Sequence, residues 1–233
     1  MEALRALFAE GVGTACCDPR AAVARPYREE ERFVERAVDS RRREFHAGRA
    51  CARMAMSALG LEGVAIPAAP DRAPVWPEGV VGSISHCATL CVAAVALVRD
   101  GYGSIGLDVE PAEPLPADLV ETICTPEEEA WLGRQPPERR MLLARAIFSA
   151  KESLYKCQYP LTGVLLDFQD IDIALHASSY HARFRRDAAG IARGTILEGR
   201  LTIEDGYILT GLTMTASRHA GLFRRLETAN LTD

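Results

Sequence analysis

Two acidic residues, Asp108 and Glu110, lie two positions apart in residues 105–110, where they alternate with apolar residues. This alternation predicts a strand with its apolar side chains on one face and both carboxylates on the other. Carboxylates this close repel each other unless a positive group accompanies them. A hard divalent cation, Mg²⁺ in particular, binds such oxygen ligands together with substrate phosphates. An exposed strand end beside the Pro-rich residues 111–116 would explain the same pattern without a ligand.

A third carboxylate, Glu152, lies in a predicted helix over residues 138–158. One side of this helix is apolar, and at 100° per residue the opposite side is polar. The polar side carries Arg145, Ser149, Glu152 and Lys156. Glu152 and Lys156 are neighbours on the helix surface, either as a weak solvent ion pair or as a base or metal ligand beside an ammonium suited to phosphate. Of 27 basic residues only Lys151 and Lys156 are lysines, which indicates a need for a compact ammonium here.

His86 follows directly after a strand-like run, residues 80–85. Ser83 and Ser85 in that run add hydroxyl groups, so the segment is suited to contact an anion. A single histidine is also typical of a structural residue whose nitrogens are satisfied within the protein. The sequence leaves both interpretations open.

The elements that must position these residues indicate an α+β fold. Residues 29–59 predict one long helix, or two joined near Gly48, with a basic face that is either solvated or binds an anion. Thr125 begins a capping box before a further helix. The predicted strands are residues 80–85, 89–98, 104–110, 170–175, 179–184, 194–203 and 207–216, with a short helix at 118–123.

Composition excludes several classes of protein. The 233 residues carry a net charge of −5 and are 48% hydrophobic, so the chain is neither disordered nor a general nucleic-acid binder. We expect no membrane span, and a first segment without the layout of a secretory signal predicts a cytoplasmic protein. Seven scattered cysteines without CxxC spacing argue against a disulfide framework, and His86 with two nearby cysteines lacks the second ligand cluster of a zinc site.

Five ordered segments together resemble the Sfp-type 4′-phosphopantetheinyl transferases, in particular the branch of enterobactin synthase component D. Each is short, but their order and separation are specific. The segments are RRREF with GRACAR (41–53), DRAPVWP (71–77), GSISH (82–86), IGLDVE (105–110) and FSAKESLYK (148–156). Phe148 departs from the tryptophan that many relatives have at this position.

The resemblance implies a fold of two pseudo-symmetric α/β halves, residues 1–103 and 104–233, with the active site in the cleft between them. It implies a monomer that uses Mg²⁺, with Mn²⁺ as a substitute, and coenzyme A as co-substrate. The implied metal ligands are Asp108, Glu110 and Glu152. The implied coenzyme A contacts are Arg41, Arg49, Arg72, Ser85, His86 and Lys156, with Lys156 beside the diphosphate. Lys151 is a further expected contact, because helical geometry points it about 100° away from Glu152, toward the pantetheine arm.

The implied reaction transfers 4′-phosphopantetheine from coenzyme A to a serine hydroxyl of an apo acyl or peptidyl carrier protein and releases adenosine 3′,5′-bisphosphate. Glu152, Lys156 and Asp108 are the expected catalytic residues, with Glu152 as the base either directly or through a metal-bound water. The resemblance favours a role in polyketide, nonribosomal peptide or siderophore synthesis, without nucleic-acid or membrane partners. Two alternatives stay open: a metal-dependent phosphohydrolase acting on nucleotides, and a non-catalytic carrier-protein adaptor.

Overall fold

The computed structural model describes residues 1–21, 23–24 and 26–215, and the α+β class predicted from sequence is confirmed. Two antiparallel sheets form the frame. The smaller has the order β1 (Gly13–Cys17), β3 (Cys91–Leu97), β2 (Val80–His86). The larger has the order β4 (Tyr102–Pro111), β8 (Tyr207–Thr215), β7 (Ile196–Glu204), β6 (Ser179–Phe184), β5 (Ile171–Leu175). The last position of the predicted strand 207–216 and the end of the predicted second half lie outside the described residues.

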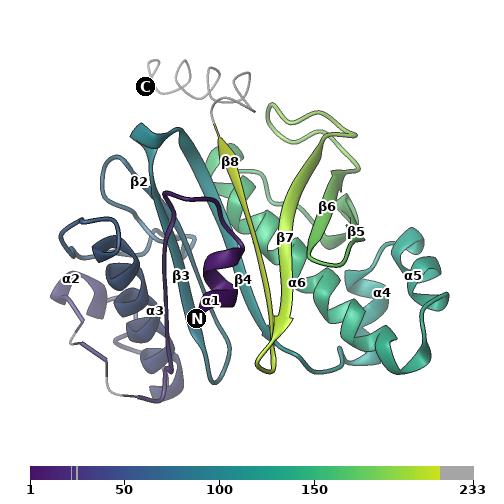
Figure 1. Cartoon of the computed structure of the whole chain (residues 1–233). Coiled ribbons are helices and arrows are strands. Elements are labelled where there is room, and N and C mark those ends of the chain that lie inside the picture. Colours follow the sequence, from purple (N-terminus) through teal and green to yellow (C-terminus); the bar gives the residue numbers. More distant parts are fainter. Residues whose placement is uncertain (22, 25, 216–233) are drawn as a thin grey trace.

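Each sheet is covered by one long helix. Figure 1 shows α3 (Asp39–Ser57) beside the small sheet and α6 (Pro137–Thr162) along the large one. The other helices are short: α1 (Glu2–Ala6), α2 (Arg28–Glu31), α4 (Val120–Ile123) and α5 (Pro126–Gly133), with single turns η1 (Val98–Asp100), η2 (Ala117–Leu119) and η3 (Phe168–Asp170). The large sheet has five strands and the small sheet three, so the two halves are similar in plan but not in size.

The helix predicted over residues 29–59 is wrong in its first half. α2 ends at Glu31, and α3 begins only at Asp39. The guanidinium of Arg42 explains the break, because it donates hydrogen bonds to three backbone carbonyls of residues 34–37 that a continuous helix would use itself. Gly48 does not interrupt α3; its missing Cβ leaves room for Ile84 of β2.

The two halves meet where β2 lies beside β4. These strands share no backbone ladder, but the Ser83 hydroxyl accepts a hydrogen bond from the Leu107 amide at 3.1 Å. The Ser85 hydroxyl accepts one from the Val109 amide at 3.4 Å. Serine hydroxyls therefore replace main-chain pairing at the seam, and this brings the end of β2 next to the acidic positions of β4.

Helix α6 lies unusually close to β4. A Cβ at Gly106 would approach the backbone oxygen of Ser153 to 1.8 Å, so only glycine fits between the two elements. The Ser104 hydroxyl donates a hydrogen bond of 2.6 Å to the carbonyl of Cys157. The apolar side of α6, including Ile147 and Leu154, is buried against the large sheet. This packing fixes the polar side of α6 over the face of β4 that carries the carboxylates.

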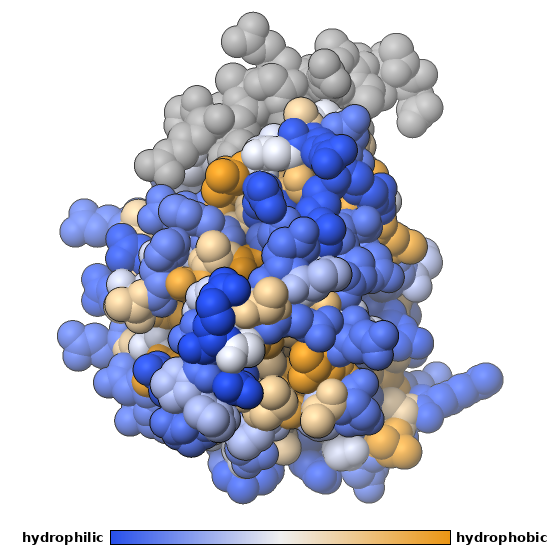
Figure 2. Space-filling view, turned by 90° about the vertical axis from the view of Figure 1, so that its right-hand side faces the viewer, coloured by the Kyte–Doolittle hydropathy of each residue, from blue (hydrophilic) through white to orange (hydrophobic). Residues whose placement is uncertain are grey.

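The capping box predicted at Thr125 is confirmed. The Thr125 hydroxyl accepts a hydrogen bond from the Glu128 amide, and the Glu128 carboxylate accepts one from the Thr125 amide. Within the described residues, no helix has the length and apolar character required to cross a membrane. Figure 2 shows one face of the molecule, on which hydrophilic residues predominate and apolar residues lie between them in small groups.

Candidate active site

A cleft of about 790 Å³ opens between the two halves. Its N-terminal walls come from α3, the loop around residues 68–76 and β2, and its C-terminal wall comes from the second half of α6. Five residues predicted to contact coenzyme A line it together: Arg41, Arg49, Arg72, His86 and Lys156. The structure therefore collects basic groups from segments far apart in the sequence at one cavity.

Asp108 lies buried at the seam below this cleft, with 3% of its surface exposed. One carboxylate oxygen, Oδ1, accepts hydrogen bonds from Ser85 at 2.8 Å and from the Lys156 ammonium at 2.6 Å. The other, Oδ2, accepts one from Ser149 at 2.8 Å. Asp108 is thus held by β2 on one side and by α6 on the other, and an exposed strand end is excluded as its explanation.

Glu110 lies two residues further along β4 and is only partly buried. Arg145 of α6 donates a hydrogen bond of 2.8 Å to its Oε2 atom. Burial raises the pKa of Glu110, and the negative charge of Asp108 raises it further. Asp108 and Glu110 are thus close because side chains two positions apart on a strand share a face. The guanidinium of Arg145 compensates part of the repulsion between the two carboxylates.

Glu152 approaches the same region from α6. Burial raises the pKa of its carboxyl, and Asp108 adds a like-charge contribution in the same direction, whereas Lys156 opposes both. Among the described residues its carboxylate has no hydrogen-bond or ion-pair partner. Glu152 also lines a second cavity of about 300 Å³, which shares Tyr155 and Leu165 with the large cleft.

Lys156 connects the buried carboxylate to the cleft. Its Nζ atom lies 2.6 Å from Asp108 Oδ1 and 3.0 Å from the Ser85 hydroxyl, while 27% of its side chain stays exposed. Ser85 itself is buried and does not line the cleft. Ser85 therefore contacts the cleft through Lys156 and Asp108, which differs from the direct phosphate contact implied by the resemblance.

His86 and Arg41 form a pair at the cleft wall. Arg41 Nη1 lies 2.8 Å from His86 Nε2, and Glu44 lies 3.7 Å from the other ring nitrogen. Burial lowers the pKa of His86, so the imidazole is neutral and accepts from the guanidinium. Arg41 is half exposed and keeps donors that face the cavity.

Arg49 and Arg72 lie on two other parts of the cleft. Arg49 is almost fully buried, and its Nε atom donates a hydrogen bond of 2.7 Å to the Ile66 carbonyl. Its guanidinium carbon lies 4.3 Å from the ring centroid of Phe45. Burial lowers the pKa of Arg49 to about 10. Arg72 is exposed, in a tight turn with a left-handed φ of 72°. Tyr159 of α6 donates a hydrogen bond of 2.9 Å to the neighbouring Asp71 and so ties this turn to the C-terminal half.

Lys151 lies outside the large cleft. Its ammonium is buried and donates three hydrogen bonds, to Glu128 Oε2 at 2.8 Å and to the carbonyls of Ile123 and Phe168 at 2.7 and 2.8 Å. These three hydrogen bonds use all three ammonium protons. The Lys151 side chain borders the smaller cavity, but its ammonium has no donor left for a ligand there. Lys151 consequently holds α4, α5 and η3 on α6.

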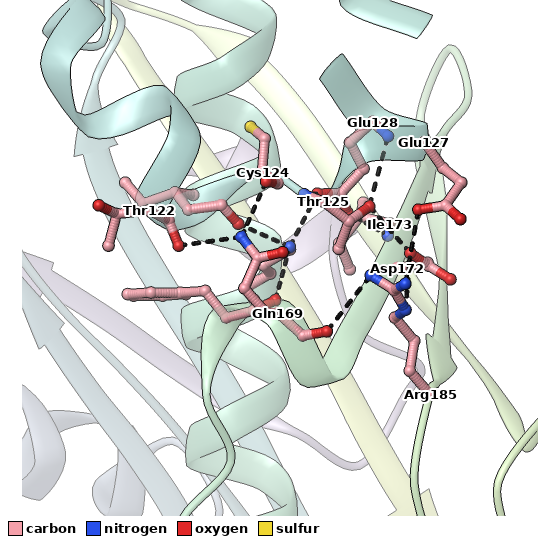
Figure 3. Close-up of polar contacts among 12 residues, drawn as sticks. Thr122, Cys124, Thr125, Glu127, Glu128, Gln169, Asp172, Ile173 and Arg185 are labelled. Carbon is pink, nitrogen blue, oxygen red and sulfur yellow. Dashed lines mark hydrogen bonds and ion pairs between the residues drawn. The ribbon is translucent and has the colours of Figure 1, made fainter. Parts of the chain in front are cut away.

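The surroundings of this lysine form a polar cluster. Figure 3 shows Thr125, Glu128 and Asp172 together with Gln169, whose side chain faces the carbonyl groups at the end of α4. The Thr125 hydroxyl donates a hydrogen bond of 2.9 Å to Asp172, and the Gln169 side chain donates one of 2.8 Å to the Cys124 carbonyl. These long-range contacts give no local signal in the sequence, apart from the capping box.

The donor types suit a hard divalent cation, because carboxylate oxygens are its usual ligands and the charge of Asp108 raises the pKa of both Glu110 and Glu152. Within the described residues, however, no group of three or more His, Cys, Asp or Glu side chains is arranged to hold a metal ion. Lys156 and Arg145 occupy the positive positions beside Asp108 and Glu110 instead. The residue types therefore fit the ion, while in this structure Asp108 and Glu110 are each paired with a basic side chain of α6.

Sequence reasoning missed two tyrosines and an aromatic partner at the cleft. Tyr155 and Tyr159 stack with ring centroids 5.3 Å apart, and both line the cleft together with Phe45. Their spacing of four residues on α6 is the signal that predicts a shared face. Phe45 follows the arginines of α3 in sequence but gave no indication of its stacking with Arg49.

Comparisons with known proteins show which family the chain belongs to. Residues 29–96 match the family model of the 4′-phosphopantetheinyl transferase N-terminal domain, and residues 104–208 match that of the 4′-phosphopantetheinyl transferase superfamily. The chain is 36% identical over 195 residues to 4′-phosphopantetheinyl transferase Npt of Nocardia iowensis, covering 78% of this chain and 86% of that protein. It is 40% identical over 195 residues to 4′-phosphopantetheinyl transferase Svp of Streptomyces mobaraensis, covering 81% and 78%.

Enterobactin synthase component D of Escherichia coli is 35% identical over a shorter stretch of 142 residues, 59% of this chain and 65% of that protein. The likeness to Npt and Svp thus extends further along the chain than the likeness to the branch expected from the motifs. The fold, the cleft and these matches define an enzyme of phosphopantetheine transfer, and the chain belongs to the 4′-phosphopantetheinyl transferase superfamily. It transfers 4′-phosphopantetheine from coenzyme A to carrier proteins.

Proposed function

We propose that coenzyme A binds in the large cleft with its diphosphate at Lys156, and that one chain supplies the whole site. The supporting observation is the convergence of basic groups from both halves on this cleft, directly above the acidic positions of β4 and α6. Arg41 and His86 face the nucleotide phosphates in this arrangement, and Arg49 and Arg72 border the remainder of the nucleotide. The halves correspond to residues 1–103 and 104–233, with the seam at β2 and β4.

The pantetheine arm then runs past Tyr155 into the smaller cavity. Tyr155 and Leu165 line both this cavity and the cleft, and apolar side chains such as Leu166 and Phe168 line the cavity together with Glu152. An arm that enters here brings its phosphate between Lys156 and Glu152. Lys151 contributes by holding the walls of this cavity, and its ammonium makes no contact with the arm.

Asp108, Glu110 and Glu152 would hold Mg²⁺ or Mn²⁺. When bound, the ion supplies charge neutralisation and orientation for the diphosphate. Binding requires that Lys156 and Arg145 give up part of their contacts with the carboxylates, and the diphosphate offers Lys156 a new partner. The chain's own residues therefore compensate the charges of Asp108 and Glu110 before the substrate arrives.

Lys156 and Glu152 perform the transfer itself. The acceptor serine oxygen attacks the phosphorus that carries the pantetheine arm, and the bond between this phosphorus and the bridging oxygen breaks. Glu152 takes the proton from the serine hydroxyl, for which its raised pKa and unpartnered carboxylate are suited. Lys156 stabilises the negative charge that develops on the departing adenosine 3′,5′-bisphosphate.

The protein substrates are carrier proteins of peptide, polyketide or siderophore synthesis. We place the reaction in the cytoplasm. Free cysteines at all seven positions agree with a reducing compartment.

The binding arrangement is tested by calorimetric titration of coenzyme A into the wild type and Arg41→Ala. Loss of a charged hydrogen bond to phosphate predicts binding weaker by about tenfold or more. Arg43→Ala is the matched control, because Arg43 lies on the same helix, is exposed and does not line the cleft. Equal affinity of Arg41→Ala and the wild type would contradict the placement. Release of adenosine 3′,5′-bisphosphate without a carrier protein would favour the phosphohydrolase alternative.

A further inference from the structure

Three cysteines from different elements meet behind the N-terminal wall of the cleft. Cys17 ends β1, Cys51 lies in the middle of α3, and Cys91 begins β3. Cys17 and Cys91 are partners in the antiparallel ladder. The Cys51 sulfur lies 2.9 Å from the Cys17 sulfur. Two thiols separated by 34 positions in sequence are thus in direct contact.

The three thiols differ in access and acidity. Cys17 is partly exposed, whereas Cys51 and Cys91 are fully buried. Hydrogen bonds from Cys51 and Cys91 lower the pKa of Cys17 to about 4, and the pKa of Cys51 is raised by the same contact and by burial. Cys17 is therefore the thiol that a small oxidant reaches first, and Cys51 lies in contact behind it. A nucleophilic thiol beside a resolving thiol is the arrangement required for reversible oxidation.

We propose that Cys17 and Cys51 form a reversible disulfide when the protein meets a hydroperoxide. Cys17, deprotonated by solvent, attacks one oxygen of hydrogen peroxide and the O–O bond breaks. A sulfenic acid forms, and the released hydroxide takes up the proton that Cys17 had lost and becomes water. The Cys51 sulfur then attacks the Cys17 sulfur, the S–O bond breaks, and hydroxide leaves as water with the proton from Cys51. Two thiols are oxidised, one peroxide is reduced to two waters, and a small thiol reverses the reaction by exchange.

The position of this bridge connects it with the substrate cleft. The segment between Cys17 and Cys51 carries much of the N-terminal wall, including Arg41, Phe45 and Arg49. A covalent link from β1 to α3 would restrict this segment in the unfolded chain and so raise the melting temperature. Oxidation would therefore stabilise the wall that faces coenzyme A, independently of how the transfer reaction proceeds.

Cys16 provides a matched control next in sequence. Successive residues of a strand point to opposite faces, and Cys16 packs with the cluster around Leu4 and Tyr102, whereas Cys17 packs with the cluster around Cys51. Cys16 is also partly exposed. A reaction that depends on accessibility alone would oxidise both residues, whereas a reaction that depends on the thiol pair would link only Cys17.

The experiment oxidises the full chain with a small excess of hydrogen peroxide, alkylates the remaining thiols, and maps the peptides by mass spectrometry. We expect loss of two hydrogen atoms, a Cys17–Cys51 cross-link, and a melting temperature that rises by several degrees and returns on reduction. Cys16→Ala should behave like the wild type. In Cys51→Ala the link should be lost and a sulfenic acid at Cys17 should be trapped by dimedone. A wild-type chain without the link, or with Cys17 joined to another cysteine, would overturn the proposal whatever the variants do.

Discussion

Replacement of Lys151 by methionine tests whether Lys151 has a structural role and Lys156 the catalytic one. The Lys151 ammonium is buried with Glu128, and its three hydrogen bonds all end within the C-terminal half. Removing one partner of a buried ion pair leaves the other charge uncompensated and costs about 3–5 kcal/mol of unfolding free energy. Because small proteins are stable by only about 5–15 kcal/mol, urea denaturation followed by circular dichroism should show a large fall in midpoint.

The double variant Lys151→Met with Glu128→Gln separates charge from packing. The unpaired buried carboxylate is absent in this variant, so about 1–3 kcal/mol of the loss should return. Lys156→Met is the matched control at the cleft: it should lower stability less, because its side chain is 27% exposed, but reduce the transfer rate by about 10²–10³-fold. A Lys151→Met protein as stable as the wild type but inactive would refute the structural role of Lys151 and restore the pantetheine contact.

Three further predictions concern Gly106, Arg49 and Tyr159, with Gly133 as a control. Gly106→Ala should unfold the protein or separate α6 from β4, because its Cβ would meet the Ser153 oxygen, whereas Gly133→Ala, with open space around it, should leave the melting temperature nearly unchanged. Arg49→Met should raise the KM for coenzyme A more than it lowers kcat, measured in a steady-state transfer assay, since Arg49 lines the cleft away from the acidic groups. Tyr159→Phe should raise the same KM only a few-fold because it releases one hydrogen bond to the exposed turn at Asp71, and an unchanged KM would contradict a role for that turn.

Local periodicity predicted much of the site. The alternation of β4 placed Asp108 and Glu110 together, and the polar side of the predicted helix indicated Arg145, Ser149 and Lys156. The structure joins these two sets, because each of the three α6 residues donates a hydrogen bond to one of the two carboxylates. Periods of two and 3.6 residues fix which side chains share a face, and burial of the opposite face fixes the orientation.

Contacts between segments that are distant in the chain could not be predicted from the sequence. Helical geometry indicated that Lys151 points about 100° away from Glu152. No feature of the neighbouring sequence indicated that its ammonium would bind Glu128 and two backbone carbonyls. The same holds for Arg42, whose guanidinium takes the carbonyls of residues 34–37 and ends the predicted helix. Both side chains satisfy backbone groups of another segment, and such pairing depends on the tertiary fold.

Glu152 offers the most direct test of the proposed site. Its carboxylate has no partner among residues 1–21, 23–24 and 26–215, so Glu152→Gln should fold normally while losing both the metal ligand and the base. The measurement is the intact mass of an apo carrier protein incubated with coenzyme A, Mg²⁺ and either the wild type or Glu152→Gln. We expect the wild type to add one phosphopantetheine group and the variant to leave the carrier unmodified over the same period. Equal rates of modification by the two proteins would contradict a catalytic centre at β4 and α6.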